Sequence, residues 1–325
     1  MKLITLIIPA YNEEKSLPKM FSRLDKLANG IKNYQLEFLF VNDGSRDKTA
    51  DILATESEKN PRISVLNFSR NFGKEIAVAA GIDHANGDAA VIMDADGQEP
   101  PELIPEMIKW FEKGFDDVYA RRSKSAEHGI KKMTSKFYYR TLQKMSRVSI
   151  QIDTGDFRLF SKKAILALRN FRETSRQNKA IFSWIGYKKK EIKFVQQERS
   201  DGETKWKFGL FSSGNSLINL AIDGFTSFTT LPLRFVTIAG FLISFVALAV
   251  IALVVIQALL GVQRAAGIPT ILVAVLFLGG IQMIALGIIG EYIGRIFIET
   301  KNRPLYLIQD FTPAKNLAKT EKKRG

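Results

Sequence analysis

Two long stretches without a charged side chain lie in the last third of the chain, at Phe235–Gln263 and Ala265–Gly290. Each exceeds the roughly 20 apolar residues that an α-helix needs to cross the hydrocarbon core of a bilayer. A turn around Gly261–Pro269 joins the two stretches. The sequence therefore predicts a multi-pass membrane protein with a hairpin of two transmembrane helices, at about 233–260 and 267–291.

Charge on either side of the hairpin predicts its orientation. The connecting loop carries Arg264, whereas the tail at 301–325 carries seven Lys/Arg against Asp310 and Glu321. Segments rich in Lys and Arg stay on the cytoplasmic side of a membrane. The N-terminal part of the chain and the tail are therefore predicted to be cytoplasmic, with the hairpin in the inner membrane.

The first 120 residues alternate short apolar runs with amphipathic stretches. The run that opens the chain is too short for a signal peptide and is typical of a buried strand. The predicted strands are Leu3–Ile8, Leu36–Val41, Ile63–Phe68 and Ala89–Met93, and the predicted helices lie at roughly 13–29, 46–58 and 73–86. Unbroken apolar strands spaced by helices indicate a parallel sheet covered on both faces.

Acidic residues follow three of these strands. Asp94 and Asp96 come directly after the fourth strand, while Tyr11-Asn12-Glu13 follows the first and Asp43-Gly44-Ser45 the second. Ligands bind parallel sheets at the carboxyl ends of the strands. Two carboxylates there can share Mg²⁺ or Mn²⁺ with a diphosphate, because these cations prefer oxygen ligands. Asp94 and Asp96 alone also fit a pair of solvated loop acids, but the two neighbouring strand ends favour a site.

The other strand ends each have two interpretations. Tyr11 offers a ring for stacking a base, and Glu13 an acceptor for a ribose hydroxyl. Asn12 as an N-cap followed by acids is, however, an ordinary start of a helix. Asp43 is placed to bind a uracil or ribose edge, or belongs to a plain turn. After the third strand, Arg70 or Lys74 faces the donor phosphates, or the segment begins a solvated helix.

A formal net charge of +14 predicts a polyanionic partner: nucleic acid, an anionic membrane or phosphate-bearing substrates. Nine Lys/Arg fall within residues 121–147, against Glu127 alone. Residues 205–228 are amphipathic, as in a helix lying in the membrane interface or one packed on the soluble part. No nucleic-acid-binding motif accompanies the charge, so lipid and phosphate are favoured. The chain has no cysteine, which excludes disulfides and thiolate metal sites.

Four segments, in order, resemble the motifs of the family 2 inverting glycosyltransferases of GT-A fold: Ile8–Glu14, Val41–Ser45, Arg70–Lys74 and Met93–Asp96. Within that family the chain is similar to the polyprenyl-phosphate glycosyltransferases, among them dolichol-phosphate mannose synthase and, more closely, the bactoprenol glucosyltransferases. The likeness covers about residues 3–300. It implies a nucleotide-sugar donor, a divalent metal (Mg²⁺ or Mn²⁺) and a polyprenyl phosphate acceptor.

The resemblance also implies roles for individual residues. The donor would be bound by Pro9, Tyr11, Glu13, Asp43, Asp94 and Lys74. Asp94 and Asp96 would hold the metal. Asp156, in the segment 153–158, matches an acid near the reacting sugar, and Arg199 and Lys205 lie in a segment that precedes the interface helix. The expected catalytic residues are Asp156, Asp96 and Arg199, and the cations expected to bind the lipid phosphate are Arg122, Lys132, Arg140 and Lys205, together with Arg199.

The expected architecture is α/β. A Rossmann-like GT-A domain that binds the nucleotide-sugar occupies 1–204, an amphipathic interface helix region 205–230, the two transmembrane helices 231–300, and a basic cytoplasmic tail 301–325. The expected reaction is metal-dependent transfer of one hexose with inversion, with glucose from UDP-glucose moving to undecaprenyl phosphate to give a lipid-linked sugar of the cell envelope. The Gln-x-x-Arg-Trp motif of processive synthases is absent from the sequence, which favours transfer of a single sugar.

Several alternatives stay open. The donor can equally be GDP-mannose or a UDP-aminoarabinose-type sugar. A protein of another class, a non-catalytic membrane scaffold or a component of a lipid-carrier flippase, would keep its function after Asp96→Ala. A dinucleotide-binding oxidoreductase is set aside, because the first turn lacks Gly-x-Gly-x-x-Gly. Relatives usually have Leu where this chain has Gly97, which predicts a looser loop beside the metal. Glycines in the second apolar stretch allow close helix approach, within the hairpin or in a homo-oligomer.

Overall fold

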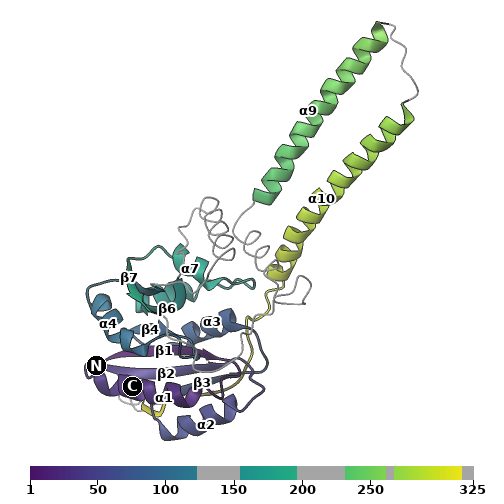
Figure 1. Cartoon of the computed structure of the whole chain (residues 1–325). Coiled ribbons are helices and arrows are strands. Elements are labelled where there is room, and N and C mark those ends of the chain that lie inside the picture. Colours follow the sequence, from purple (N-terminus) through teal and green to yellow (C-terminus); the bar gives the residue numbers. More distant parts are fainter. Residues whose placement is uncertain (123–153, 196–230, 261–266, 317–325) are drawn as a thin grey trace. The chain divides into compact units, whose positions relative to one another are not determined.

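The computed structural model describes residues 1–122, 154–195, 231–260 and 267–316 (Figure 1). The chain divides into two compact units, one formed by Met1–Lys207 with Pro304–Gly325 and the other by Phe208–Arg303. The predicted interface helix region and the predicted site residues Lys132, Arg140, Arg199 and Lys205 lie outside the described residues.

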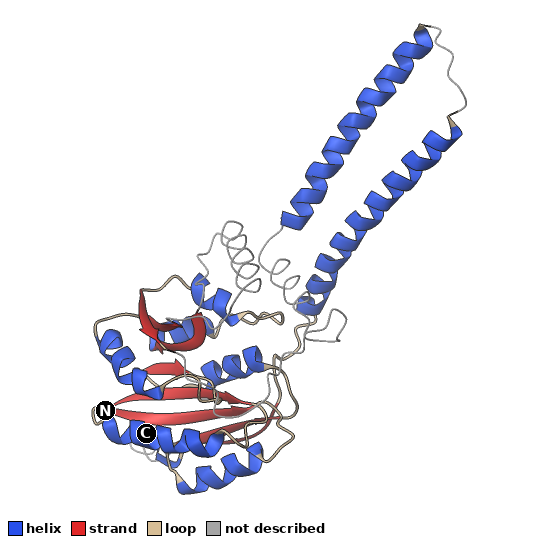
Figure 2. Ribbon diagram, in the orientation of Figure 1, coloured by secondary structure: helices blue, strands red, loops and turns tan. Residues whose placement is uncertain are grey.

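The first unit is built on an eight-stranded sheet in the order β7-β5-β6-β4-β1-β2-β3-β8 (Figure 2). Its strands are β1 (Lys2–Ala10), β2 (Tyr34–Asn42), β3 (Ile63–Phe68), β4 (Ala89–Ile92), β5 (Asp117–Arg122), β6 (Thr154–Ser161), β7 (Lys189–Phe194) and β8 (Ile308–Thr312). The first four are the four predicted strands, and they pair in parallel, so that Leu6 faces Phe38 on β2 and Val91 on β4. The predicted parallel sheet is therefore confirmed in its centre.

Helices cover both faces of this sheet, as predicted. Those of the first unit are α1 (Leu17–Gly30), α2 (Thr49–Lys59), α3 (Lys74–His84), the short 3₁₀ helix η1 (Pro101–Leu103), α4 (Ile104–Glu112), α6 (Lys162–Leu168) and α7 (Asn178–Trp184). α1, α2 and α4 pack into one core with Phe38 and Phe40, while α3, α6 and α7 pack on the other face around Ile7 and Ile92. In α1 the buried residues recur every three or four positions, which is the spacing that places them on one stripe of a helix.

Two antiparallel strands, β6 and β8, extend the sheet beyond the predicted strands. β6 runs antiparallel to both β4 and β5, with Ile92 opposite Arg158. This reversal matters for the site, because it brings the start of β6 to the edge where β4 ends. On the far side of the sheet, β8 pairs antiparallel with β3. β8 lies within residues 301–325, for which the sequence predicts only a basic cytoplasmic tail.

The second unit contains the helices α9 (Leu231–Leu259) and α10 (Ile268–Thr300), close to the two predicted spans. Large apolar side chains on them are exposed, as Phe241 is to 75% and Phe245 to 74%. Within the described residues, Phe277–Thr300 is the one stretch long and apolar enough to cross a bilayer, and Phe235–Val250 is a shorter apolar stretch. The structure thus supports a membrane-associated helix, and the two-span hairpin stays a prediction.

Candidate active site

The carboxyl edge of the central strands gathers the predicted acids of the first unit. β1, β2, β3 and β4 are parallel, so the loops that follow them leave from the same edge of the sheet. Asp43 follows β2 and Asp94 lies just beyond β4. Since β6 is antiparallel to β4, its early residue Asp156 reaches the same edge.

Lys74 joins the two acids on the β4 side. It is the first residue of α3, and its Nζ lies 2.6 Å from Asp94 Oδ1 and 3.3 Å from Asp156 Oδ2. Burial acts to lower the pKa of Lys74, but the two carboxylates outweigh burial and raise it, so the ammonium stays charged. The Lys74 side chain is 46% exposed, so an anionic ligand can approach it from solvent. The predicted donor-phosphate residue Lys74 is therefore placed directly between two predicted site acids.

Glu99 is a further buried acid, next to Asp94. It is 3% exposed, and its Oε2 accepts a hydrogen bond from the backbone N–H of Asp94 at 2.8 Å. Burial, followed by repulsion from Asp94, raises its pKa well above the usual range. Gly155 has no side chain, and Glu99 and Arg122 lie close to the β6 backbone there. A Cβ added to Gly155 would be 3.3 Å from Glu99 Oε1 and 3.9 Å from Arg122 Nη2. The predicted phosphate-binding Arg122 is thus brought to the site.

Asp156 combines deep burial with a negative charge. It is 6% exposed, and its Oδ1 has no hydrogen-bond partner among the described residues. Burial acts to raise its pKa, but Lys74, Lys179 and Arg158 together outweigh burial and lower it. An ionised carboxylate with an unused buried oxygen is a group available to a ligand.

Glu75, the next residue of α3, was not predicted as part of the site. Its Oε2 accepts a hydrogen bond from the N–H of Asn178 at 2.7 Å, which ties α3 to the first residue of α7. Burial and the charge of Asp156 raise the pKa of Glu75 to about 7. Its sequence context, one acid in a run that begins a helix, gives no sign of this contact.

Asp96 lies in the loop between β4 and η1, where its Oδ1 accepts a hydrogen bond from the N–H of Gln98 at 3.0 Å. The following Gly97 has φ +76, a conformation that side-chain-bearing residues rarely adopt. Its carbonyl accepts a hydrogen bond from Arg23 Nη1 at 3.1 Å. The glycine therefore permits a turn whose carbonyl is held by Arg23 of α1, and the looser loop expected for Gly97 stays a prediction.

The acids after β4 suit a hard cation. Asp94 and Asp96 supply only oxygen donors, and one or two carboxylates suffice for Mg²⁺ or Mn²⁺ when phosphates and waters complete the shell. Within the described ranges there is no group of three or more His, Asp or Glu that could hold a metal alone. Asp94 is already paired with Lys74, so these residues fit a cation that arrives with a phosphate-bearing ligand.

The β1 and β2 side of the edge is organised differently. Asp43 is buried, and its carboxylate accepts hydrogen bonds from the N–H groups of Phe72 at 2.6 Å and Gly73 at 2.9 Å and from Asn71 Nδ2 at 2.9 Å. Burial raises the pKa of Asp43, although these hydrogen bonds act to lower it. Asp43 therefore holds the loop that leads to Lys74, a role that its turn-like sequence did not indicate.

The predicted Pro9, Tyr11 and Glu13 lie beside Asp43, at the end of β1. Pro9 is a buried residue of β1, and Glu13 accepts a hydrogen bond from Ser16 Oγ at 2.6 Å. Asn12 does not cap the helix, because α1 begins at Leu17 and Asn12 takes φ +53 with its Oδ1 accepting from the N–H of Arg46. These bonds tie the loop after β1 to the loop after β2.

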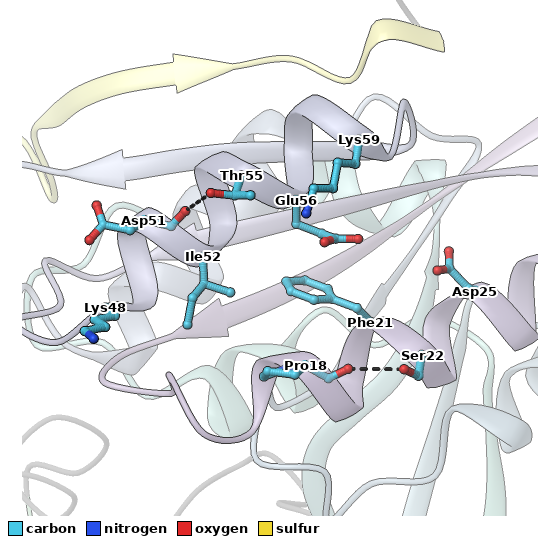
Figure 3. A pocket seen from close by; sticks show the side chains of 10 residues that line it. All are labelled: Pro18, Phe21, Ser22, Asp25, Lys48, Asp51, Ile52, Thr55, Glu56 and Lys59. Carbon is cyan, nitrogen blue, oxygen red and sulfur yellow. Dashed lines mark hydrogen bonds between the residues drawn. The ribbon is translucent and has the colours of Figure 1, made fainter.

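Two cavities lie near this side. One, of about 390 Å³, is bordered by the loops after β2 and β3 and by Asp310 of β8. The other is a groove of about 460 Å³ between α1 and α2, with Phe21 and Ile52 facing each other across it (Figure 3). The groove contains none of the predicted site residues, so the candidate site is the cluster around Lys74.

The chain is similar to known proteins over most of its length. The model of "Glycosyl transferase family 2" matches residues 5–169. An uncharacterised glycosyltransferase of Synechocystis is 42% identical over 309 residues, covering 94% of this chain and 95% of its own. A prophage bactoprenol glucosyl transferase homolog of Escherichia coli K12 is 40% identical over 307 residues, covering 94% and 98%. Among solved structures, a mannosyltransferase of Pyrobaculum calidifontis with GDP-Man and Mn²⁺ is 19% identical at a TM-score of 0.43, covering 61% of this chain and 57% of that one.

Proposed function

The chain belongs to glycosyl transferase family 2, and from that premise we propose that it moves one glucose from UDP-glucose to a polyprenyl phosphate, with inversion at the anomeric carbon. The expected family is thereby confirmed, and the sheet of the first unit confirms the expected α/β class. The donor, the acceptor and the metal belong to the proposal.

The meeting of Asp94, Asp156 and Lys74 carries this proposal. Two acids from different strands converge on one ammonium at the carboxyl edge, 2.6 Å and 3.3 Å away. Such a cluster can exchange its internal ion pairs for contacts with a diphosphate and a sugar. Keeping three partly or fully buried charges together at this edge of the sheet is unfavourable, because desolvation opposes them, so a purely structural role does not explain the cluster.

The acceptor proposal rests on the relatives and on the apolar helix. A chain covering nearly all of this one is named a bactoprenol glucosyl transferase homolog, and bactoprenol is the lipid carrier in that name. The stretch Phe277–Thr300 would place the catalytic unit at a bilayer. The net charge of +14 favours anionic lipid by roughly 1 kcal/mol per cation near the surface. An inner-membrane enzyme with its catalytic unit and tail in the cytoplasm fits these observations.

In the proposed mechanism, Pro9, Tyr11, Glu13 and the loop held by Asp43 bind the nucleoside. Lys74 leaves its carboxylate partners to contact the donor phosphates. A divalent cation held by Asp96 and Asp94 would neutralise the leaving diphosphate as a Lewis acid.

The acceptor needs little help from a base, because a phosphate monoester is already ionised at neutral pH. The main task is then to align its oxygen with the sugar carbon. Asp156 would position the sugar or the acceptor through its unused Oδ1. The cations Arg122, Lys132, Arg140, Arg199 and Lys205 would draw in the lipid phosphate. One displacement converts an α-linked donor into a β-linked product.

Product analysis tests the proposal. Membranes containing the protein are incubated with undecaprenyl phosphate and, separately, UDP-glucose, GDP-mannose and a UDP-aminoarabinose-type donor, and the lipid extract is examined by mass spectrometry and NMR. We expect undecaprenyl phosphate carrying one β-linked glucose. Product from another donor would change the assigned sugar, an α-linked product would exclude single displacement, and no product from any donor would favour a non-catalytic protein.

A further inference from the structure

Arg158 is a buried arginine directly beneath the site, with no role in the proposed mechanism. It lies two positions after Asp156 on β6, so the two side chains point to the same face of the sheet. It is 1% exposed. A fully buried guanidinium is rare unless well paired, so its neighbours show what it does.

The pairing of Arg158 is incomplete. Its Nη1 lies 3.3 Å from Asp117 Oδ2 on β5, and its Nη2 lies 3.4 Å from the carbonyl oxygen of Gly155. The ring of Phe182 on α7 lies 4.7 Å from its guanidinium carbon. Arg158 Nε and Asp117 Oδ1 have no hydrogen-bond partner in the described ranges. A buried pair of this kind contributes little to stability, and apolar replacements are often as stable.

The contacts of Arg158 lead to Asp156 along two routes. The carbonyl of Gly155 belongs to the peptide that ends at the nitrogen of Asp156, so the guanidinium holds the backbone just before the acid. The positive charge also acts on the carboxylate: the charged groups that face Asp156 are Lys74 and Glu75 on α3, Lys179 on α7, Glu99 in the loop after β4, and Arg158 on its own strand. Of the three cations, Arg158 alone is fully buried, so it is least screened by water and does not move to a ligand.

We propose that Arg158 is a positioning residue that fixes Asp156 for the transfer reaction. It does so through its hydrogen bond to the Gly155 carbonyl and through the permanent positive charge that it places near the Asp156 carboxylate. This inference rests on the proposed function for the reaction that Asp156 serves. Asp117 is the counter-charge that retains Arg158 in the sheet. When Lys74 turns to the donor phosphates, Arg158 and Lys179 are the cations that keep Asp156 ionised, and Arg158 is the buried one of the two.

Three substitutions separate charge from packing. Arg158→Met removes the charge and keeps an unbranched chain, Arg158→Lys keeps the charge but not the forked contact, and Asp117→Asn removes the counter-charge. Arg172→Met is the matched control, because Arg172 pairs with Asp83 at 2.6 Å outside the site. Each variant is assayed in the full chain for kcat and KM across pH. The titration midpoint of Asp156 is followed by NMR with ¹³C-labelled aspartate carboxyl groups, assigned by Asp156→Asn.

Arg158→Met should lower kcat about tenfold or more with little change in KM, and should move both the acid limb of the rate profile and the Asp156 midpoint to higher pH. Arg158→Lys should keep the midpoint near wild type. Asp117→Asn should leave the midpoint unchanged or move it to lower pH, and Arg172→Met should change neither quantity.

A midpoint that does not move in Arg158→Met would overturn the inference, even if the variant is less stable. The double variant Arg158→Met with Asp117→Asn removes both buried charges, so its stability should approach wild type while the midpoint stays high. Because the NMR midpoint needs no sugar, it decides the role of Arg158 even if no donor is accepted. Failure of the proposed function would instead appear as a wild-type protein without product.

Discussion

The two sides of the carboxyl edge both carry buried acids, but their carboxylates are paired in opposite ways. After β1 and β2, the carboxylate of Asp43 accepts hydrogen bonds from three donors of one loop. After β4 and on β6, Asp94 and Asp156 share one lysine, Asp156 keeps an unused buried oxygen, and Glu99 is buried close by. On the first side the acid is saturated by the loop that it holds, whereas on the second side three acids are only partly neutralised by Lys74.

This difference separates an acid that stabilises a loop from acids that can bind or transform a ligand. Hydrogen bonds between an acid and backbone N–H groups stabilise a loop in one conformation and leave little for a substrate. Charges held close together with incomplete pairing are typical of sites that bind or transform a ligand. Substitutions on the first side should therefore change stability most, and those on the second side should change activity most.

The largest effect is expected for Asp96→Ala. The carboxylate is proposed to hold the cation that neutralises the leaving diphosphate, so kcat/KM should fall about 10³-fold or more. The measurement is the initial rate of lipid-linked sugar formation with Mg²⁺ or Mn²⁺ added after chelation. Asp51→Ala, an exposed acid on α2, is the control. An Asp96→Ala enzyme that keeps its rate would remove the metal from the mechanism.

A smaller loss is expected for Lys74→Met. Without the ammonium, Asp94 and Asp156 lose their shared partner and the donor phosphates lose a cation, so kcat/KM should fall about 10²-fold. Lys74→Arg should lose less, and Lys19→Met on the exposed side of α1 should behave as wild type. Rates of Lys74→Met within about threefold of wild type would make the ion pairs a structural feature only.

On the other side, Asp43→Ala should act mainly on stability. It leaves the N–H groups of Phe72 and Gly73 without their acceptor, which costs about 2–3 kcal/mol of unfolding free energy. Urea unfolding of the detergent-solubilised protein measures this, with Asp51→Ala as the control. A rise in donor KM should accompany it, because the loop leads to Lys74. A variant as stable as wild type but inactive would show instead that Asp43 contacts the donor directly.

The smallest effect concerns the pH dependence of stability and Glu75. Its pKa is raised to about 7 in the folded protein, so between its ordinary value and about 7 the folded state binds more protons than the unfolded state. The contribution of Glu75 to the free energy of unfolding is therefore fully present at low pH, and it is lost as the pH rises from the ordinary glutamate pKa through about 7. Glu75→Gln should be more stable than wild type at pH 8, by about 1–3 kcal/mol, and similar at pH 5.

The control for that prediction is Glu58→Gln, an exposed acid on α2. Unfolding curves at pH 5, 6, 7 and 8 give the slope for each protein. A wild-type slope that Glu75→Gln leaves unchanged would assign the pH dependence to other groups.

The parts that sequence predicts best are the parts that are buried on both sides. Strands such as β1 and β2 consist of continuous apolar residues, because helices cover both of their faces, and this pattern is visible without a structure. β7 (KKEIKF) buries only Ile192 and Phe194, and every residue of β8 is exposed, so neither has the pattern of a core strand. These edge strands and the antiparallel β6 could not be predicted from the sequence.

The candidate site could likewise be predicted only in part. Its location was predictable, since parallel strands deliver the residues that follow them to one edge. Its internal pairing was not, because Lys74 meets Asp156 only through the antiparallel placement of β6. The burial of Glu99 and the loop-holding role of Asp43 depend on contacts between segments far apart in the chain. Local motifs indicate which acids matter, and tertiary structure decides which are saturated.

Strand β8 has a consequence for the order in which the protein is made. It pairs with β3 at positions such as Asn67 and Asp310, which are 243 residues apart, and both long apolar helices are synthesised between them. Until the last residues leave the ribosome, β3 is a bare edge that other chains can pair with. The helices emerge before the strand that covers this edge. The sheet of the first unit is therefore completed after both apolar helices have been synthesised, so an enzyme that acts at a bilayer, as proposed, would mature beside it.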